Sequence, residues 1–153
     1  MVIQIDSREK ERAIKQIIQE FDKHDIQHPV SKLYVGDYMS YDNPRLIVDR
    51  KQNLTEVCQN VCQDHERFRA ELIRAQKAEI HIVILVEHGK GIHSLEDVIW
   101  WDNPRLRVSP RATRGEVLYK KLKTIERKYG CEFVFCDKKE TGQKIIEILG
   151  GAA

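Results

Sequence analysis

The stretch Leu46-Ile47-Val48-Asp49-Arg50-Lys51 has the pattern of a buried strand that ends in charged residues. Its aliphatic half contains β-branched side chains and is typical of a central strand that is covered on both faces of a sheet. Because successive side chains of a strand point to opposite faces, Asp49 and Lys51 are expected on one face and Arg50 on the other. A strand that simply emerges into water also ends in charged residues, so this tripeptide alone does not establish a site.

The segments around this strand alternate between strand and helix patterns. The expected strands are 2–5, parts of 30–41, 80–86 and 131–136, and the expected helices are 8–23, 54–75, 113–129 and 140–149. Ser7 is expected to cap the first helix, Asp42-Asn43-Pro44 to form a turn, and 94–112 to be irregular. The interleaving predicts one α/β domain over residues 1–150, in which helices flank both faces of a mixed central sheet.

The composition, with 41% hydrophobic and 33% charged residues, is that of an ordinary globular protein. No apolar run reaches the roughly 18 residues that a membrane-spanning helix needs. The N-terminus has no charged leader before an apolar stretch, so it is interpreted as a strand rather than a signal peptide. We therefore expect a cytoplasmic protein without a membrane partner, and the net charge of +2 is too small to identify any other partner.

The four cysteines and six histidines do not have the spacing of a metal site. Cys58 and Cys62 are one turn apart on an expected helix, and Cys131 and Cys136 flank an expected strand. Neither pair has the two-residue spacing of a zinc knuckle, so reduced and mostly buried thiols are favoured over a metal site. No histidine is assigned a role.

Basic residues gather between residues 105 and 128, with only Glu116 and Glu126 against them. The basic residues are Arg105, Arg107, Arg111, Arg114, Lys120, Lys121, Lys123, Arg127 and Lys128. Such a cluster could bind phosphates, with Arg111, Arg114 and Lys120 as candidate phosphate contacts, or could form a solvated helix face. The preceding pair Trp100-Trp101 is interpreted either as an interface or base-stacking surface, or as half core and half surface.

Further acids are expected near Asp49. Asp37 follows Gly36 at a break in an alternating segment, as at a bend or bulge, although a turn residue is the plainer interpretation. Asp6 ends the first expected strand. If the strand of Asp37 pairs beside that of Asp49, two carboxylates and the Lys51 ammonium converge. Such a group suits Mg²⁺ or Mn²⁺ and phosphodiester hydrolysis, in which Lys51 positions or deprotonates water or neutralises developing charge.

The order Asp6-Ser7-Arg8-Glu9, Gly36-Asp37, Asp49-Arg50-Lys51 resembles the nuclease domain of XPF-type structure-specific endonucleases. These enzymes belong to the wider PD-(D/E)xK group related to restriction enzymes. The resemblance covers about residues 1–90 and includes Arg67-Phe68 on the helix after the signature. It implies a restriction-endonuclease-like fold and an endonuclease dependent on Mg²⁺ or Mn²⁺.

By this resemblance Asp37 and Asp49 are metal ligands, the carbonyl of Arg50 is a further ligand, and Lys51 is the catalytic lysine. Asp6 and Arg50 are counted with these catalytic residues. Together with Arg8, Glu9 and Arg67 they are expected to shape the site or to contact DNA phosphates. Glu9 and Glu20 are the weakest candidates, the latter because related enzymes sometimes place an acid on the first helix.

The sequence departs from the family pattern at two positions of the signature. Its first acid is Asp49 where the family usually has Glu, and its trailing acid falls at Thr55, which has no carboxylate. Glu56 is adjacent, but on a helix it points about 100° away. The family's tandem helix-hairpin-helix module is not expected either. A stand-alone nuclease domain, as in phage or mobile-element proteins, would bind DNA through the basic stretch, a second subunit or a partner.

The sequence therefore predicts a metal-dependent endonuclease for branched or flapped DNA, active in DNA repair or recombination. The resemblance also implies a homodimer, and no small-molecule cofactor is expected. Two alternatives stay open. One is an inactive nuclease fold that serves as a DNA- or partner-binding scaffold, and the other is a restriction nuclease specific for a short duplex sequence.

Overall fold

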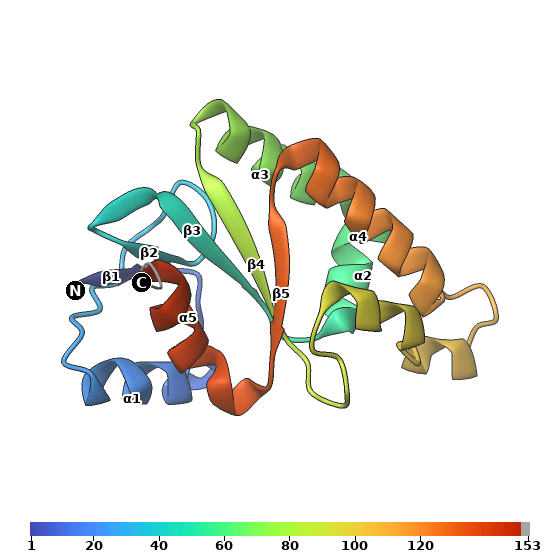
Figure 1. Ribbon diagram of the computed structural model, residues 1–153, viewed down its shortest axis with the longest axis horizontal. Helices are drawn as coiled ribbons and strands as arrows, with labels where there is room; N and C mark the ends of the chain where they lie inside the picture. Colours follow the sequence, from blue (N-terminus) through green and yellow to red (C-terminus); the bar gives the residue numbers. More distant parts are fainter. Residues whose placement is uncertain (151–153) are drawn as a thin grey trace.

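Five strands form a single mixed sheet in the computed structural model, which describes residues 1–150 (Figure 1). In sheet order they are β1 (Ile3–Ile5), β2 (Tyr38–Ser40), β3 (Asn43–Lys51), β4 (His81–Glu87) and β5 (Glu132–Cys136). Strands β1, β2 and β3 pair antiparallel, whereas β3, β4 and β5 pair parallel. The mixed sheet predicted from the sequence is confirmed.

Helices cover both faces of this sheet, as predicted. One face packs against α1 (Lys15–Lys23) and α5 (Thr141–Leu149), and the other against α2 (Leu54–Cys62), α3 (His65–Lys77) and α4 (Gly115–Tyr129). In Figure 1 the first pair lies at the left of the sheet and the other three helices at the right. Short 3-10 helices span Glu11–Ala13, Leu95–Trp100, Pro104–Arg107 and Lys138–Glu140. Each helix buries an apolar stripe, so two cores form, one on each face.

Strand β3 contributes to both cores in alternation. Ile47 is buried in the core beneath α2 and α3, and Val48 is buried in the core beneath α1 and α5. The alternation continues past the aliphatic residues, so Asp49 and Lys51 extend the face of Ile47 and Arg50 extends the face of Val48. The parallel pairing of β3 with β4 continues through Lys51, which keeps these charged residues within the sheet.

The first helix begins later than the sequence predicts. Regular α-helix starts at Lys15 rather than Arg8, after a short 3-10 turn, and Ser7 caps no helix. The chain turns instead because the carboxylate of Asp6 accepts a hydrogen bond from the backbone N–H of Arg8, at 3.1 Å. A side chain that binds a nearby backbone N–H competes with the helical pattern in this way.

The single helix predicted over 54–75 is wrong, because it is two helices. The N–H groups of Gln63 and Asp64 both donate to the carbonyl of Gln59, at 2.9 and 3.0 Å, which closes α2. Asp64 then leaves helical geometry, with ψ +34°, before α3 begins at His65. Similarly, only the part Tyr38–Ser40 of the alternating segment 30–41 forms a strand, which is β2.

The cysteines and the tryptophan pair divide between core and surface. Cys131 and Cys136 are buried, Cys58 and Cys62 are half-buried, and all four thiols are free. The side chains of the tryptophan pair differ, since Trp101 is 7% exposed and Trp100 is 82% exposed. Within residues 1–150 no helix combines the length and apolar character that crossing a membrane requires.

Gly36 fixes the turn that leads into Asp37. Its φ of +69° is rarely adopted by residues with a side chain, and a Cβ atom there would lie 2.3 Å from Cγ2 of Ile47. The backbone of this turn can therefore lie directly against β3 only if residue 36 is glycine.

We expect Gly36→Ala to destabilise the fold by about 2–4 kcal/mol, since backbone strain and a steric clash with Ile47 combine. In a domain of this size the melting temperature falls by roughly 5–10 °C, measurable by circular dichroism. Gly91→Ala is the matched control, because Gly91 also has a positive φ (+82°) but nothing lies within 4 Å of the added Cβ. Equal losses in the two variants would contradict the role of the Ile47 contact.

Candidate active site

A polar cleft of about 280 Å³ opens where β3 ends. Its walls come from four parts of the chain: the segment Arg8-Glu9, the turn Gly36-Asp37, the end of β3, and the facing sides of α2 and α3. Asp37, Asp49 and Lys51 all line it. The structure thus brings together the three residues that the sequence analysis placed at its centre.

The carboxyl groups of Asp37 and Asp49 lie within hydrogen-bonding reach of each other. Backbone pairing fixes this arrangement. The Asp37 N–H donates to the carbonyl of Val48 at 2.9 Å, and the Arg50 N–H donates to Oδ2 of Asp37 at 2.8 Å. Burial and the negative charges of Asp49 and Glu9 raise the pKa of Asp37 well above the usual range of an aspartate. Two buried like charges at this spacing favour either a shared proton or a bound cation.

Lys51 supplies a positive charge beside these acids. Its Nζ lies 3.4 Å from Oδ2 of Asp49 and 5.5 Å from the centre of the Phe68 ring. Burial opposes the charged amine, but the carboxylates of Asp49 and Glu56 outweigh it, so the net pKa of Lys51 is raised. The side chain is therefore a protonated ammonium, suited to neutralising negative charge rather than to accepting a proton.

The donor atoms of this cleft fit a hard divalent cation. Mg²⁺ and Mn²⁺ prefer carboxylate, carbonyl and water oxygens, and Mg²⁺ is commonly held by one or two carboxylates while it keeps several waters. Across residues 1–150, no three His, Cys, Asp or Glu side chains stand as a ready-made ligand cluster. The protein would therefore provide Asp37 and Asp49, and water or substrate oxygens would complete the coordination shell.

Arg50 lies on the opposite face of β3, and its guanidinium is engaged by two buried carboxylates. Its Nε donates to Oε2 of Glu9 at 2.8 Å, its Nη1 donates to Oε1 of Glu87, and the hydroxyl of Tyr38 donates to Glu9 at 2.9 Å. Although burial opposes the charge, the hydrogen bonds and charges of Glu9 and Glu87 raise the pKa of Arg50. Arg50 and Glu9, which were expected to shape the site or to contact phosphates, thus bind each other, and a phosphate contact of Arg50 stays a prediction.

Asp6 is not brought into the cleft. Its side chain is fully buried, where Oδ1 accepts the N–H of Leu33 at 2.8 Å and Oδ2 accepts Nε of Arg8 at 2.7 Å. Burial raises the pKa of Asp6, but these hydrogen bonds outweigh burial and lower it. Asp6 was expected as a catalytic acid, but the structure does not place its carboxylate with those of Asp37 and Asp49. Asp6 fixes Arg8 at the rim of the cleft.

Comparison with known proteins agrees with this architecture. The model of the ERCC4 domain family matches residues 5–149. This chain belongs to the ERCC4 domain family. No curated protein sequence matches it. The predicted resemblance to XPF-type nuclease domains is thereby confirmed.

Two solved structures share the fold of this ERCC4 domain. XPF from Aeropyrum pernix matches with a TM-score of 0.71 at 19% identity, and XPF from Aeropyrum pernix in complex with DNA matches with a TM-score of 0.67 at 19% identity. Each match covers 97% of this chain and 63% of the other chain, so this chain spans less than two thirds of its relative. The restriction-endonuclease-like α/β fold predicted from the sequence is confirmed.

The other site residues that were predicted from the sequence lie partly inside and partly outside the cleft of this ERCC4 domain. Arg8 and Arg67 line the cleft. Glu20 does not, because its Oε1 lies 3.0 Å from His24 Nε2 and the side chain packs against α5. Thr55 also lies elsewhere, in a hollow of about 200 Å³ on another side of α2, together with Arg111.

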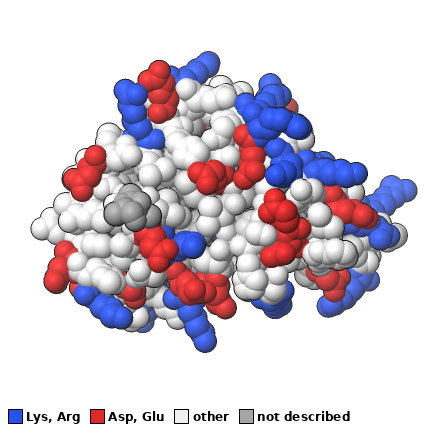
Figure 2. All heavy atoms as spheres, in the orientation of Figure 1, with Lys and Arg blue, Asp and Glu red and all other residues white. Residues whose placement is uncertain are grey.

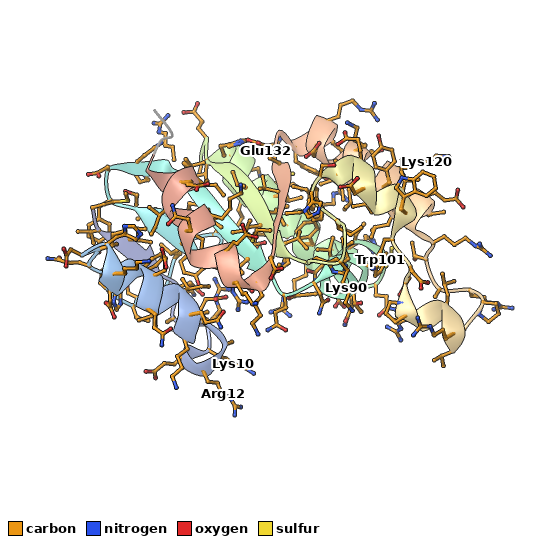
Figure 3. The ribbon with its side chains drawn as sticks, turned by 60° about the horizontal axis from the view of Figure 1, so that its bottom comes forward. Lys10, Arg12, Lys90, Trp101, Lys120 and Glu132 are labelled. Atoms are coloured by element: carbon orange, nitrogen blue, oxygen red, sulfur yellow. The ribbon has the colours of Figure 1, made fainter. Side chains whose placement is uncertain are left out.

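Basic residues of the 105–128 stretch form an exposed surface along α4. Figure 2 shows Lys and Arg side chains following this helix at the upper right, whereas the middle of the same view is mostly uncharged with patches of acids. Arg114 immediately precedes α4, and Lys120 lines a groove of about 370 Å³ between α3 and α4. Figure 3 shows Lys120 at this end of the molecule, far from Lys10 and Arg12.

Glu71 lies in the cleft but was not singled out from the sequence. Its Oε1 accepts the N–H of Gly36 at 3.2 Å. Burial and the charge of Asp49 raise its pKa, against the opposing effect of Lys51. One sequence signal was present, because Glu71 follows Arg67 by four residues and therefore lies on the same side of the helix.

We expect Asp37→Asn to stabilise the protein in the absence of metal. Because folding raises the pKa of Asp37, its ionisation opposes folding. This penalty is absent below about pH 3.9, where the unfolded carboxyl is also protonated, and grows as pH rises toward the folded pKa. Asparagine keeps an acceptor for the Arg50 N–H. In EDTA the variant should melt a few degrees higher than wild type at pH 7.5, with little difference near pH 4.

The control for this measurement is Asp42→Asn, at an exposed turn, which should leave the melting temperature unchanged at both pH values. A lower melting temperature for Asp37→Asn at pH 7.5 would show that Asp37 stabilises the fold, contrary to the prediction.

Proposed function

We propose that this ERCC4 domain is a divalent-metal-dependent endonuclease that hydrolyses DNA phosphodiester bonds, preferentially in branched or flapped DNA. The observation that carries the proposal is the convergence of Asp37, Asp49 and Lys51 in one cleft. The family membership supports it, and a solved structure of similar fold is a complex with DNA. The cleft is polar and open, which suits a charged polymer.

Asp37 and Asp49 would hold Mg²⁺ or Mn²⁺, with the carbonyl of Arg50 as a further oxygen ligand. When bound, such a cation polarises the scissile phosphate and lowers the pKa of a bound water. Hydrolysis adds one water across a phosphorus–oxygen bond. Lys51, as an ammonium 3.4 Å from Asp49, would orient the phosphate and offset the charge that grows on its oxygens during attack.

Arg8 and Arg67 would receive the flanking phosphates. Both side chains line the cleft, and their residues have substantial exposed surface. Asp6 fixes the Arg8 guanidinium through a hydrogen bond of 2.7 Å, so its position is set before DNA binds. Pre-positioned charges of this kind contribute to catalysis without reorganisation.

An inactive DNA-binding scaffold is the second candidate, because Thr55 provides no acid and lies outside the cleft. The like charges at Asp37 and Asp49 oppose it, since a scaffold gains nothing from buried carboxylates near DNA. Calorimetric titration with Mn²⁺ separates the candidates, because a scaffold should bind no metal specifically. The XPF resemblance also favours a homodimer, and exposed Trp100 and Val108 are candidate contacts.

We expect the purified protein to nick flap, fork or junction DNA with Mg²⁺ or Mn²⁺, and Asp49→Ala and Lys51→Ala each to lower the rate by about 10²-fold or more. Both variants should keep the circular dichroism spectrum of the wild type. The exposed residues Asp42 and Lys77 provide matched alanine controls. A wild-type protein that leaves duplex, flap, fork and junction DNA intact with either ion would refute the proposed activity.

We also expect Arg111, Arg114 and Lys120 to contact DNA phosphates. Changing any one to Gln should weaken binding for all sequences alike and lower the slope of log Kd against log salt by about 0.9. Fluorescence anisotropy in EDTA measures binding without cleavage. Arg45→Gln is the control, since Arg45 pairs with Glu79 at 2.9 Å at the far end of β3. Unchanged slopes in all three variants would exclude these contacts.

A further inference from the structure

We propose that Glu71 is a positioning residue for the divalent cation of this cleft, acting through one of the cation's water ligands. In this role it replaces the acid that the family pattern places at position 55. The inference rests on the proposed function, since it concerns the same cation that Asp37 and Asp49 would bind.

The backbone places Glu71 beside these two acids. Phe68 and Leu72 are buried against the sheet, which directs the adjacent Glu71 of α3 into the cleft. Its Oε1 is held by the N–H of Gly36, the residue immediately before Asp37. Within residues 1–150 this is the one hydrogen bond that the Glu71 carboxylate makes, so Oε2 is free to accept a hydrogen bond from water.

Neither Thr55 nor its neighbour Glu56 is held at the turn of Gly36 and Asp37 as Glu71 is. Thr55 lies in the hollow on another side of α2. The Oε1 of Glu56 accepts the N–H of Gln52 at 2.7 Å, while the N–H of Glu56 donates to Oδ1 of Asn53 at 2.8 Å. These contacts cap the start of α2, and the first of them holds Oε1 of Glu56 at the backbone of Gln52.

A buried amide oxygen in the same cleft points independently to a hydrated ligand. Asn60 of α2 lines the cleft, and its Oδ1 is buried with no hydrogen-bond partner among the described residues. Buried polar atoms in proteins are nearly always satisfied, so this acceptor calls for a donor. The water ligands of a divalent cation provide O–H donors for both Asn60 and Glu71.

Charge leads to the same conclusion. The residues that line the cleft include six acids and four basic residues, which leaves two negative charges when all are ionised. The acids are Glu9, Asp37, Asp49, Glu56, Asp64 and Glu71, and the basic residues are Arg8, Arg50, Lys51 and Arg67. A divalent cation would balance the remainder. A direct bond from Glu71 is not favoured, because no three acidic, His or Cys side chains in residues 1–150 are placed to hold one ion together. Contact through water agrees with the negative charge of the cleft and with the lack of a third direct ligand. It is also favoured because Mg²⁺ releases its waters reluctantly.

The test is calorimetric titration of Mn²⁺ into wild type, Glu71→Gln and Glu71→Ala. Glutamine keeps an oxygen for the Gly36 N–H but removes the charge, so it separates metal positioning from bracing of the turn. We expect Glu71→Gln to keep the wild-type fold and to bind Mn²⁺ about 10-fold more weakly, as is typical of residues that orient metal ligands. Glu66→Gln, an exposed change on the same helix, should bind like wild type.

Two results would overturn the assignment. One is a Glu71→Gln affinity within about two-fold of the wild type, with a loss only in Glu71→Ala, which would leave Glu71 as a brace for Gly36. The other is a wild-type protein that binds no Mn²⁺. If Mn²⁺ binds, Glu71→Gln weakens it and no DNA is cut, the nuclease proposal fails while the role of Glu71 stands.

Discussion

The buried guanidinium of Arg50 is the interaction on which the arrangement of the site depends. It lies between Glu9 and Glu87, with Tyr38 bonded to the same Glu9 carboxylate, and so joins the N-terminal segment to β2, β3 and β4. A buried charge is tolerated only when its partners are in place. The pairing therefore fixes the segment that carries Arg8, and it keeps β3 in the sheet up to the residue where the cleft begins.

On the other face of β3, neighbouring carboxylates repel one another. There Asp37, Asp49 and Glu71 share one cleft with Lys51, and burial and the negative charge of Asp49 raise the pKa of both Asp37 and Glu71. Such an arrangement opposes folding when the cleft contains no cation. Functional sites commonly hold unfavourable charges that a ligand relieves, and a divalent cation with its waters would relieve these.

The break between α2 and α3 shapes the cleft on this face of the sheet. Both halves of 54–75 have helical periodicity, so the sequence indicates one helix, and only the sheet beneath decides where it must bend. The bend lets Leu54 and Val57 of α2, and Phe68 and Leu72 of α3, reach the same core. It also directs Glu71 toward the cleft. The four-residue spacing from Arg67 indicates a shared side of the helix, but not that this side faces the cleft.

The sequence by itself determined the mixed α/β sheet and the common face of Asp49 and Lys51, because these follow from strand alternation and short-range order. The grouping of Asp37 with them followed from the order of the motifs. It also carried the family pattern. Only the tertiary structure decided that Asp6 and Arg50 brace the site, that Glu71 enters it and that Thr55 does not. Those outcomes depend on contacts between segments distant in the chain, such as Asp6 with Leu33 and Glu71 with Gly36, and no local pattern encodes which partner a buried charge will find.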